Sequence, residues 1–174
     1  CWLMTTLTTN YLTPTGREEA WRFTPLKRLG GLHDGTAVVA DRHSLTLSSA
    51  PVAGVSFALL SALDASPISE SDDVIVSRIR DFAKEVSVLT IAANTEVAQP
   101  IFLKRTPGAL DSAEFSRVLI RVEKHARATV IIENSGDTHL AEDVEISVAP
   151  GANLTLVTLQ EWDSKTIHAG RHHA

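Results

Sequence analysis

The feature that most constrains this chain is a repeat of 26 residues in its second half. Residues 118–132 can be laid over residues 144–158, and in both copies apolar and polar side chains alternate. A tight corner interrupts the alternation, at His125 in the first copy and at Gly151 in the second. Alternation with a period of two predicts strands that bury one face. A two-strand unit that recurs at this period is typical of a β-solenoid, in which each coil stacks on the one before.

The two copies match position by position. Apolar residues coincide at the constant offset of 26, in the pairs Ile120/Ile146, Val122/Val148, Ala126/Ala152, Ala128/Leu154 and Val130/Leu156. A looser third copy occupies residues 97–103, whose alternation precedes that of residues 126–132 by 29 positions. The sequence therefore predicts a mainly β core of at least three coils over residues 86–174.

Residues 1–85 carry a different pattern, which predicts a small N-terminal α+β section. Thr15 followed by Glu18 has the spacing of a capping box and predicts a short helix. Residues 72–84 place apolar side chains at helical spacing behind two aspartates, which predicts a second helix.

Three shorter segments complete the N-terminal section. Residues 36–40 and 44–47 are expected to be strands that flank polar residues. Residues 55–63 are apolar and could form a strand or a helix, and the run Phe-Ala-Leu-Leu-Ser-Ala-Leu at residues 57–63 favours a helix that ends near Asp64.

Composition excludes several classes of protein. The net charge of −5 lacks the basic excess that nucleic-acid-binding domains usually carry. The single cysteine, Cys1, excludes an internal disulfide and a Cys-rich metal site. No run of 18 apolar residues offers a membrane span, and the start has no secretory signal pattern, whether it lies at Cys1 or at Met4. We therefore expect a cytoplasmic protein that binds neither nucleic acid nor membrane.

The inward-facing row of the second copy carries the main candidate positions. Gln160 and Trp162 continue the parity of Leu154 and Leu156, so both are expected inside the stack or at its edge. A buried glutamine must find hydrogen-bond partners. The row predicts either a polar ladder between coils or a polar path through the lumen, and the sequence leaves both open.

The histidines give a weaker indication. His168, His172 and His173 lie within six residues and could share a metal ion, although a solvated chain end explains them as well. The other four stand beside turn residues and are predicted to be surface groups: His33, His43, His125 and His139.

The acidic residues between the coils are predicted to form a solvated rim, because they alternate between the two faces of their strands. They are Glu133, Glu142, Asp143 and Glu145. The sequence contains no nucleophile elbow, P-loop, dinucleotide-binding glycine motif or HExxH zinc motif. We therefore expect a protein that is not an enzyme.

Three stretches resemble the SufB/SufD family of iron–sulfur cluster assembly proteins. Residues 16–26, Gly-Arg-Glu-Glu-Ala-Trp-Arg-Phe-Thr-Pro-Leu, resemble the N-terminal helical motif of the SufD branch. Residues 117–133 resemble the opening of the family's core, and Leu-Gln-Glu-Trp at residues 159–162 resembles one of its strands. The resemblance covers most of residues 14–168 and implies a right-handed parallel β-helix between helical parts.

The resemblance also implies a function. Proteins of the SufD branch are non-enzymatic scaffold subunits that act with SufB and with the SufC ATPase, and a homodimer is an alternative assembly. The full complex assembles the cluster transiently, so this chain is expected to hold no cofactor of its own. Gln160 and Trp162 match positions that in SufB line a lumen thought to pass sulfur.

The last coil has neither a capping helix nor a polar terminal coil, and an open stack would expose an apolar edge. The sequence therefore predicts a longer protein or a covering partner. The alternative function is a β-helix enzyme or binding module for carbohydrate, for which one Tyr and five Phe provide few aromatic platforms. A hexapeptide-repeat acyltransferase would need a six-residue period, which the sequence lacks.

Overall fold

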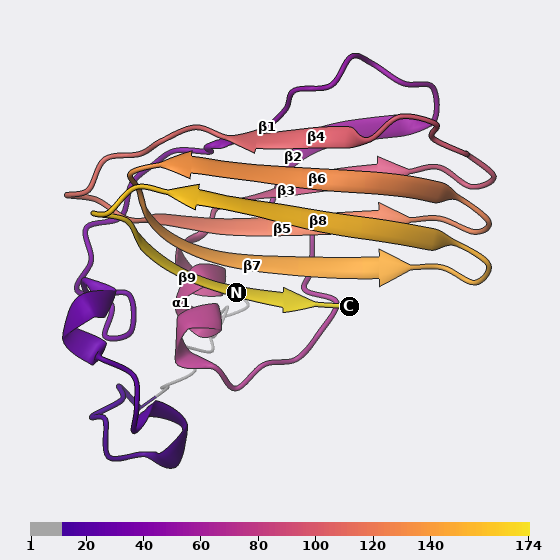
Figure 1. The fold of residues 1–174 in the computed structure, drawn as a ribbon. Helices are drawn as coiled ribbons and strands as arrows, with labels where there is room; N and C mark the ends of the chain where they lie inside the picture. Colours follow the sequence, from indigo (N-terminus) through magenta and orange to yellow (C-terminus); the bar gives the residue numbers. More distant parts are fainter. Residues whose placement is uncertain (1–11) are drawn as a thin grey trace, which may run out of the picture.

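The computed structural model describes residues 12–174, which form a mainly β fold (Figure 1). The helical elements are η1 (Glu19–Trp21), η2 (Leu26–Leu29) and α1 (Val74–Phe82). The strands are β1 (Leu45–Leu47), β2 (Val55–Ser61), β3 (Glu85–Ile91), β4 (Ile101–Arg105), β5 (Glu114–Val122), β6 (Arg127–Gly136), β7 (His139–Val148), β8 (Asn153–Trp162) and β9 (Ile167–His173). The predicted boundary between residues 85 and 86 falls at the start of β3, and the division into two parts stays a prediction.

The strands form two mixed sheets that are not closed on each other. One sheet has the order β1-β4-β6-β8 and the other the order β2-β3-β5-β7-β9. From β4 to β9 the chain passes from one sheet to the other at every step, and each new strand lies parallel to the strand two before it. β1 and β2 pair antiparallel with β4 and β3, so they differ from the rest. The predicted mainly β class is confirmed.

The predicted repeat is confirmed as the register of the parallel strands. Val118 pairs with Val144 and Ala128 with Leu154, each at the offset of 26 residues. The looser copy is confirmed too, because Ile101 pairs with Val130 at the offset of 29. Apolar residues of matching positions therefore stack directly on one another and form the main core between the two sheets, which includes Ile91, Leu103, Ile120, Val130, Ile132 and Val144.

The corners of successive coils lie against each other. His125 has a φ of 58° and Gly151 a φ of 75°, so both turn through the left-handed region. A Cβ atom at Gly151 would collide with the imidazole ring of His125. The φ of Gly151 therefore favours glycine at this corner, and the small space that the earlier corner leaves requires it.

Helix α1 covers the outer face of the five-stranded sheet (Figure 1). Ile75 and Ile79 of the helix pack with Phe115 of β5 and Ala141 of β7 in a second apolar cluster. Asp73 caps the helix, since its Oδ1 accepts hydrogen bonds from the backbone N–H groups of Ile75 (2.8 Å) and Val76 (3.0 Å). The helix predicted for residues 72–84 is confirmed.

The helix predicted for residues 57–63 is wrong, because residues 55–61 form β2. Phe57 and Leu60 point to opposite faces, one toward the main core and the other toward a small cluster on the outer face. A short apolar run does not distinguish a strand from a buried helix, and here pairing with β3 overrides the helical preference of Ala and Leu.

The first helix is confirmed only in part. The Glu18 carboxylate accepts hydrogen bonds from the backbone N–H (3.0 Å) and the hydroxyl (2.9 Å) of Thr15, and hydrogen bonds from the backbone lower the pKa of Glu18 to about 2. The element that follows is a single 3-10 turn, η1, rather than an α-helix. Of the strands predicted for residues 36–40 and 44–47, the second is confirmed as β1, and the first is reduced to an isolated bridge at Val39. Within residues 12–174 no helix is long and apolar enough to cross a membrane.

Candidate functional site

A layer of polar side chains lies between the two sheets at one end of the main core. Arg105, the last residue of β4, is in register with Asn134 of β6, and Asn134 is in register with Gln160 of β8. Glu114 of β5 and Glu142 of β7 reach this row from the opposite sheet and contact Arg105. The polar residues of this layer lie on the same face of their strands as Leu103 and Ile132, which point into the core. The repeat therefore determines where the polar layer lies.

Arg105 is the centre of the layer and is fully buried. Its Nη2 donates to Glu142 Oε2 at 2.6 Å and its Nε donates to Asn134 Oδ1 at 3.1 Å. Its Nη1 donates to Ser44 Oγ at 2.9 Å and lies 3.5 Å from Glu114 Oε1. A buried charge is tolerated only where it is paired and hydrogen-bonded, so these contacts connect the two sheets through the interior.

Glu142 links Arg105 to the last strand. Its Oε1 lies 3.0 Å from His168 Nε2 on β9, while its Oε2 accepts from Arg105. Burial by itself would raise the pKa of Glu142, but the charge of Arg105 and the hydrogen bond from His168 outweigh burial and lower the pKa to about 2. The carboxyl is therefore ionised at neutral pH although it is almost fully enclosed.

The layer reaches the surface at its far end. The Trp162 indole lies against the His168 imidazole with the ring centroids 5.2 Å apart, and its Nε1–H donates to Gln160 Oε1. Trp162 and His168 are half-buried and Gln160 is exposed, because β8 and β9 are the outermost strands of their sheets. The predicted common row of Gln160 and Trp162 is present in the register, and their functional role stays a prediction.

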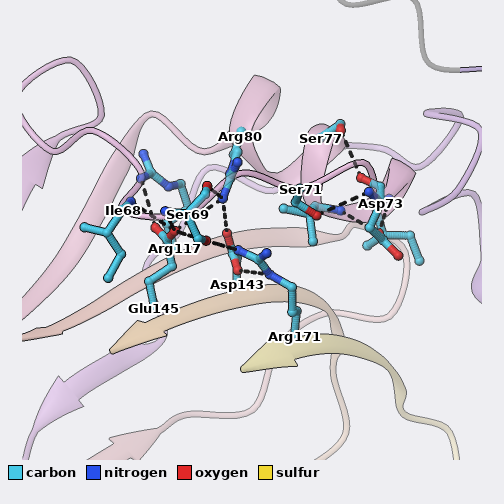
Figure 2. Close-up of polar contacts among 12 residues, drawn as sticks. Ile68, Ser69, Ser71, Asp73, Ser77, Arg80, Arg117, Asp143, Glu145 and Arg171 are labelled. Atoms are coloured by element: carbon cyan, nitrogen blue, oxygen red, sulfur yellow. Dashed lines mark hydrogen bonds and ion pairs between the residues drawn. The ribbon is translucent and has the colours of Figure 1, made fainter. Parts of the chain in front are cut away.

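A second group of charged side chains lies on the outer face of β7, under α1 (Figure 2). Asp143 accepts from Arg171 Nε at 2.9 Å and from Arg80 Nη2 at 3.3 Å. Glu145 Oε1 accepts from the backbone N–H and the hydroxyl of Ser69, at 3.1 Å and 2.8 Å, and from Arg80 at 3.3 Å. These contacts fasten the loop before α1, the helix itself and β9 to one central strand.

Arg117 completes the second group from β5. Its Nη2 lies 3.6 Å from Glu145 Oε2, and burial lowers the pKa of the guanidinium while the charge of Glu145 opposes that shift. The group therefore contains three arginines and two carboxylates in a largely enclosed layer.

The predicted solvated rim is wrong for three of its four carboxylates. Glu142, Asp143 and Glu145 are exposed by only 1%, 1% and 2%, and Glu133 is half-buried. β7 has the interior on one side and α1 on the other, so both faces of this strand are buried. The sequence analysis did not predict the arginine partners of these carboxylates. The signal in the sequence is that charged residues occur on both faces of a strand that the repeat places in the core.

The histidines fall into three situations. His43, which lies beside Glu85, and His125 are exposed, in agreement with surface positions, whereas His33 is half-buried beside Asp34. His139 is buried instead, because η2 covers the start of β7, and desolvation lowers its pKa.

The three C-terminal histidines do not converge. His168 contacts Glu142, whereas His172 and His173 are exposed. No three side chains of His, Cys, Asp or Glu within residues 12–174 gather in a way that could hold a metal ion. The predicted alternative of a solvated chain end fits His172 and His173.

Comparison with known proteins finds similarity to one family. Residues 104–174 match the family described as SUF system FeS cluster assembly, SufBD core domain. These matched residues contain most of the polar layer, from Arg105 to His168. The chain is also 32% identical over 165 residues to an iron–sulfur cluster assembly SufBD family protein of Mycobacterium tuberculosis, and 32% identical over 164 residues to one of Mycobacterium leprae. These matches support the SufBD family.

The similarity to these SufBD proteins covers 92% of this chain and 41% of each relative. The chain therefore spans less than half the length of the curated relatives it matches.

Proposed function

We propose that this chain is part of a scaffold subunit for iron–sulfur cluster assembly, of the SufD branch, and that it has no enzymatic activity of its own. The observation that carries the proposal is the match of residues 104–174 to the SufBD core domain. The parallel register supports it, because the strands within the match repeat at 26 residues and enclose a polar layer.

The architecture that we propose for the whole protein is a right-handed parallel β-helix. Strands β4 to β9 support this proposal, because they alternate between two sheets and every new strand lies parallel to its predecessor in the same sheet. The open edges of β8 and β9 would then pair with further coils or with a partner subunit.

The polar layer would serve the scaffold as a fixed interior surface. Arg105 and Arg42 balance the charges of Glu142 and Glu114, so the layer contributes no strong net field at its centre. The amide of Gln160 and the indole of Trp162 then supply neutral donors and acceptors at the accessible end. The iron–sulfur cluster is the cargo of the full complex, and this chain needs no resident cofactor for the role.

The partners that we propose are a SufB-like subunit and a SufC-like ATPase, in the cytoplasm. The test is copurification of the tagged full-length protein with the SufB-like and SufC-like proteins of its source organism. We expect all three in one peak on size-exclusion chromatography. Separate elution of the SufD-like protein from both others would overturn the proposal.

The role of Gln160 and Trp162 needs a separate measurement. Gln160→Leu and Trp162→Phe should leave the complex intact and lower the amount of cluster that it carries, read from visible absorbance and iron content. Thr155→Val is the matched control, because Thr155 is an exposed residue of the same strand that faces away from the layer. Unchanged cluster content in both variants would leave the polar ladder with a structural role alone.

A further inference from the structure

Within residues 12–174, strand β2 is an edge strand without the features that usually protect such an edge. It pairs only with β3 within the part of the chain that the structure describes, and it forms one border of the five-stranded sheet. Natural edge strands are usually short, charged, bulged or interrupted by proline, because an open edge invites pairing with another chain. β2 has seven residues, Val-Ser-Phe-Ala-Leu-Leu-Ser, with no charge and no proline, and its register with β3 runs without a bulge.

The apolar side chains of β2 are incompletely covered. Val55 and Phe57 face the main core but are only partly buried, and Leu59 on the same side is 43% exposed. The neighbouring Val52 is 38% exposed. β1, the corresponding edge of the other sheet, has only three residues, so it is shorter than β2. An additional strand beside β2 would cover these side chains as well as the unpaired backbone groups.

The sequence of β2 is complementary to itself in the antiparallel sense. If two copies pair with Ala58 opposite Ala58, Phe57 of each copy lies opposite Leu59 of the other on the core side. On the outer side Ser56 lies opposite Leu60, and the small Ala58 residues meet at the two-fold axis. No charge is buried and no like charges meet in this register, so nothing in the strand opposes its pairing with a second copy.

We propose that β2 is a homodimerisation edge, through which two copies of this chain join their five-stranded sheets into one continuous sheet. The two β2 strands pair antiparallel at the centre of that sheet. A two-fold contact of this kind is isologous, so it closes after two copies and does not continue into a filament. The contact is small, which places it among weak, concentration-dependent interfaces. The proposal is independent of the partners proposed above, because β2 lies outside the residues that match the SufBD core domain.

Disulfide trapping tests the contact and its register together. In a Cys1→Ser background, Ala58→Cys places two thiols at the two-fold axis, where opposed Cα atoms are about 4.5–5.5 Å apart and within reach of a disulfide. Ser56→Cys is the matched control, since it lies two residues away on the same face of the same edge. In the proposed register the two thiols of this control are four residues apart along the strands, or roughly 13 Å, which is too far for a disulfide.

We expect Ala58→Cys to form a covalent dimer under mild oxidation at high protein concentration, and Ser56→Cys to remain largely monomeric. Equal trapping of the two variants, or trapping of neither, would overturn the proposal. A second measurement uses Ala58→Lys, which sets like charges against each other at the axis without touching the core. Sedimentation should show a dimer for the unmodified protein and a monomer for this variant, with Thr155→Lys on the β8 edge still dimeric. A dimer that survives Ala58→Lys also refutes the β2 contact.

Discussion

Replacing Arg105 with methionine tests whether the interior charge pair holds the two sheets together. Methionine has a similar length and keeps the packing of the side chain, but it leaves Glu142 and Glu114 without their buried cation. Breaking a buried pair by removing one partner typically costs about 3–5 kcal/mol. We therefore expect the free energy of unfolding to fall by about that amount, measured by urea denaturation at pH 7. The control is Arg127→Met, since Arg127 is exposed at the start of β6.

The same variant should change how stability depends on pH. The pKa of Glu142 is about 2 in the folded protein against an ordinary value of 4.5, so its ionised form stabilises the fold. A difference of this size corresponds to about 3 kcal/mol, present above pH 4.5 and lost as the pH falls toward 2. Without Arg105, burial is expected to dominate and raise the pKa of Glu142, so acidification should then stabilise the variant relative to neutral pH.

Denaturation at a series of pH values from 7 down to about 2 separates these cases, because the unmodified protein loses the contribution of Glu142 only below pH 4.5. The reasoning is refuted if Arg105→Met costs less than about 1 kcal/mol at pH 7, or if its stability falls with acid as steeply as that of the unmodified protein.

Three further perturbations follow from the geometry. Gly151→Ala should lower stability by about 1–3 kcal/mol in thermal denaturation, because of its positive φ and the contact with His125, and the additional change His125→Gly should restore part of the loss. A Gly151→Ala protein of unchanged stability would contradict the corner contact. Asp73→Ala should cost about 1 kcal/mol by loss of the α1 cap, whereas Asp72→Ala should cost little, and equal losses would count against the cap. Arg171→Met should destabilise less than Arg105→Met, since the Arg171 side chain is 22% exposed and water can partly replace its contact with Asp143.

The register of the parallel strands could be predicted because apolar side chains at matching positions stack on each other. Val118 and Val144 coincide in sequence for the same reason that they coincide in space, since both fill one layer of the core. The polar layer could be predicted only at its end, where Gln160 and Trp162 interrupt an apolar row. Arg105 gave no such signal, because it is the last residue of a strand before a Pro/Gly loop and resembles a solvated end.

The periodicity of the sequence could predict neither the charged group on the outer face of β7 nor the strand β2. A strand that is buried on one face alternates in polarity, but β7 is buried on both and carries charges on both, so Asp143 and Glu145 resembled exposed residues. Their burial depends on α1, whose position over the sheet is a tertiary contact. The residues of β2 have the composition of a helix, and they form a strand only because they pair with β3.

The two faces of β7 have a consequence for the accuracy of folding. Glu142 points inward to Arg105 and Asp143, the next residue, points outward to Arg80 and Arg171. A slip of β7 by one residue would move Asp143 to the position of Glu142, where a carboxylate would still face Arg105. Glu142 would move outward to the position of Ala141, and Arg80 and Arg171 would lose the carboxylate of Asp143. The same slip would turn Val144 outward and put Glu145 among the aliphatic side chains of the core, which costs several kcal/mol. The contact with Arg105 therefore distinguishes the two alignments poorly, and the apolar residues beside it, together with the outer ion pairs of Asp143, favour the correct one.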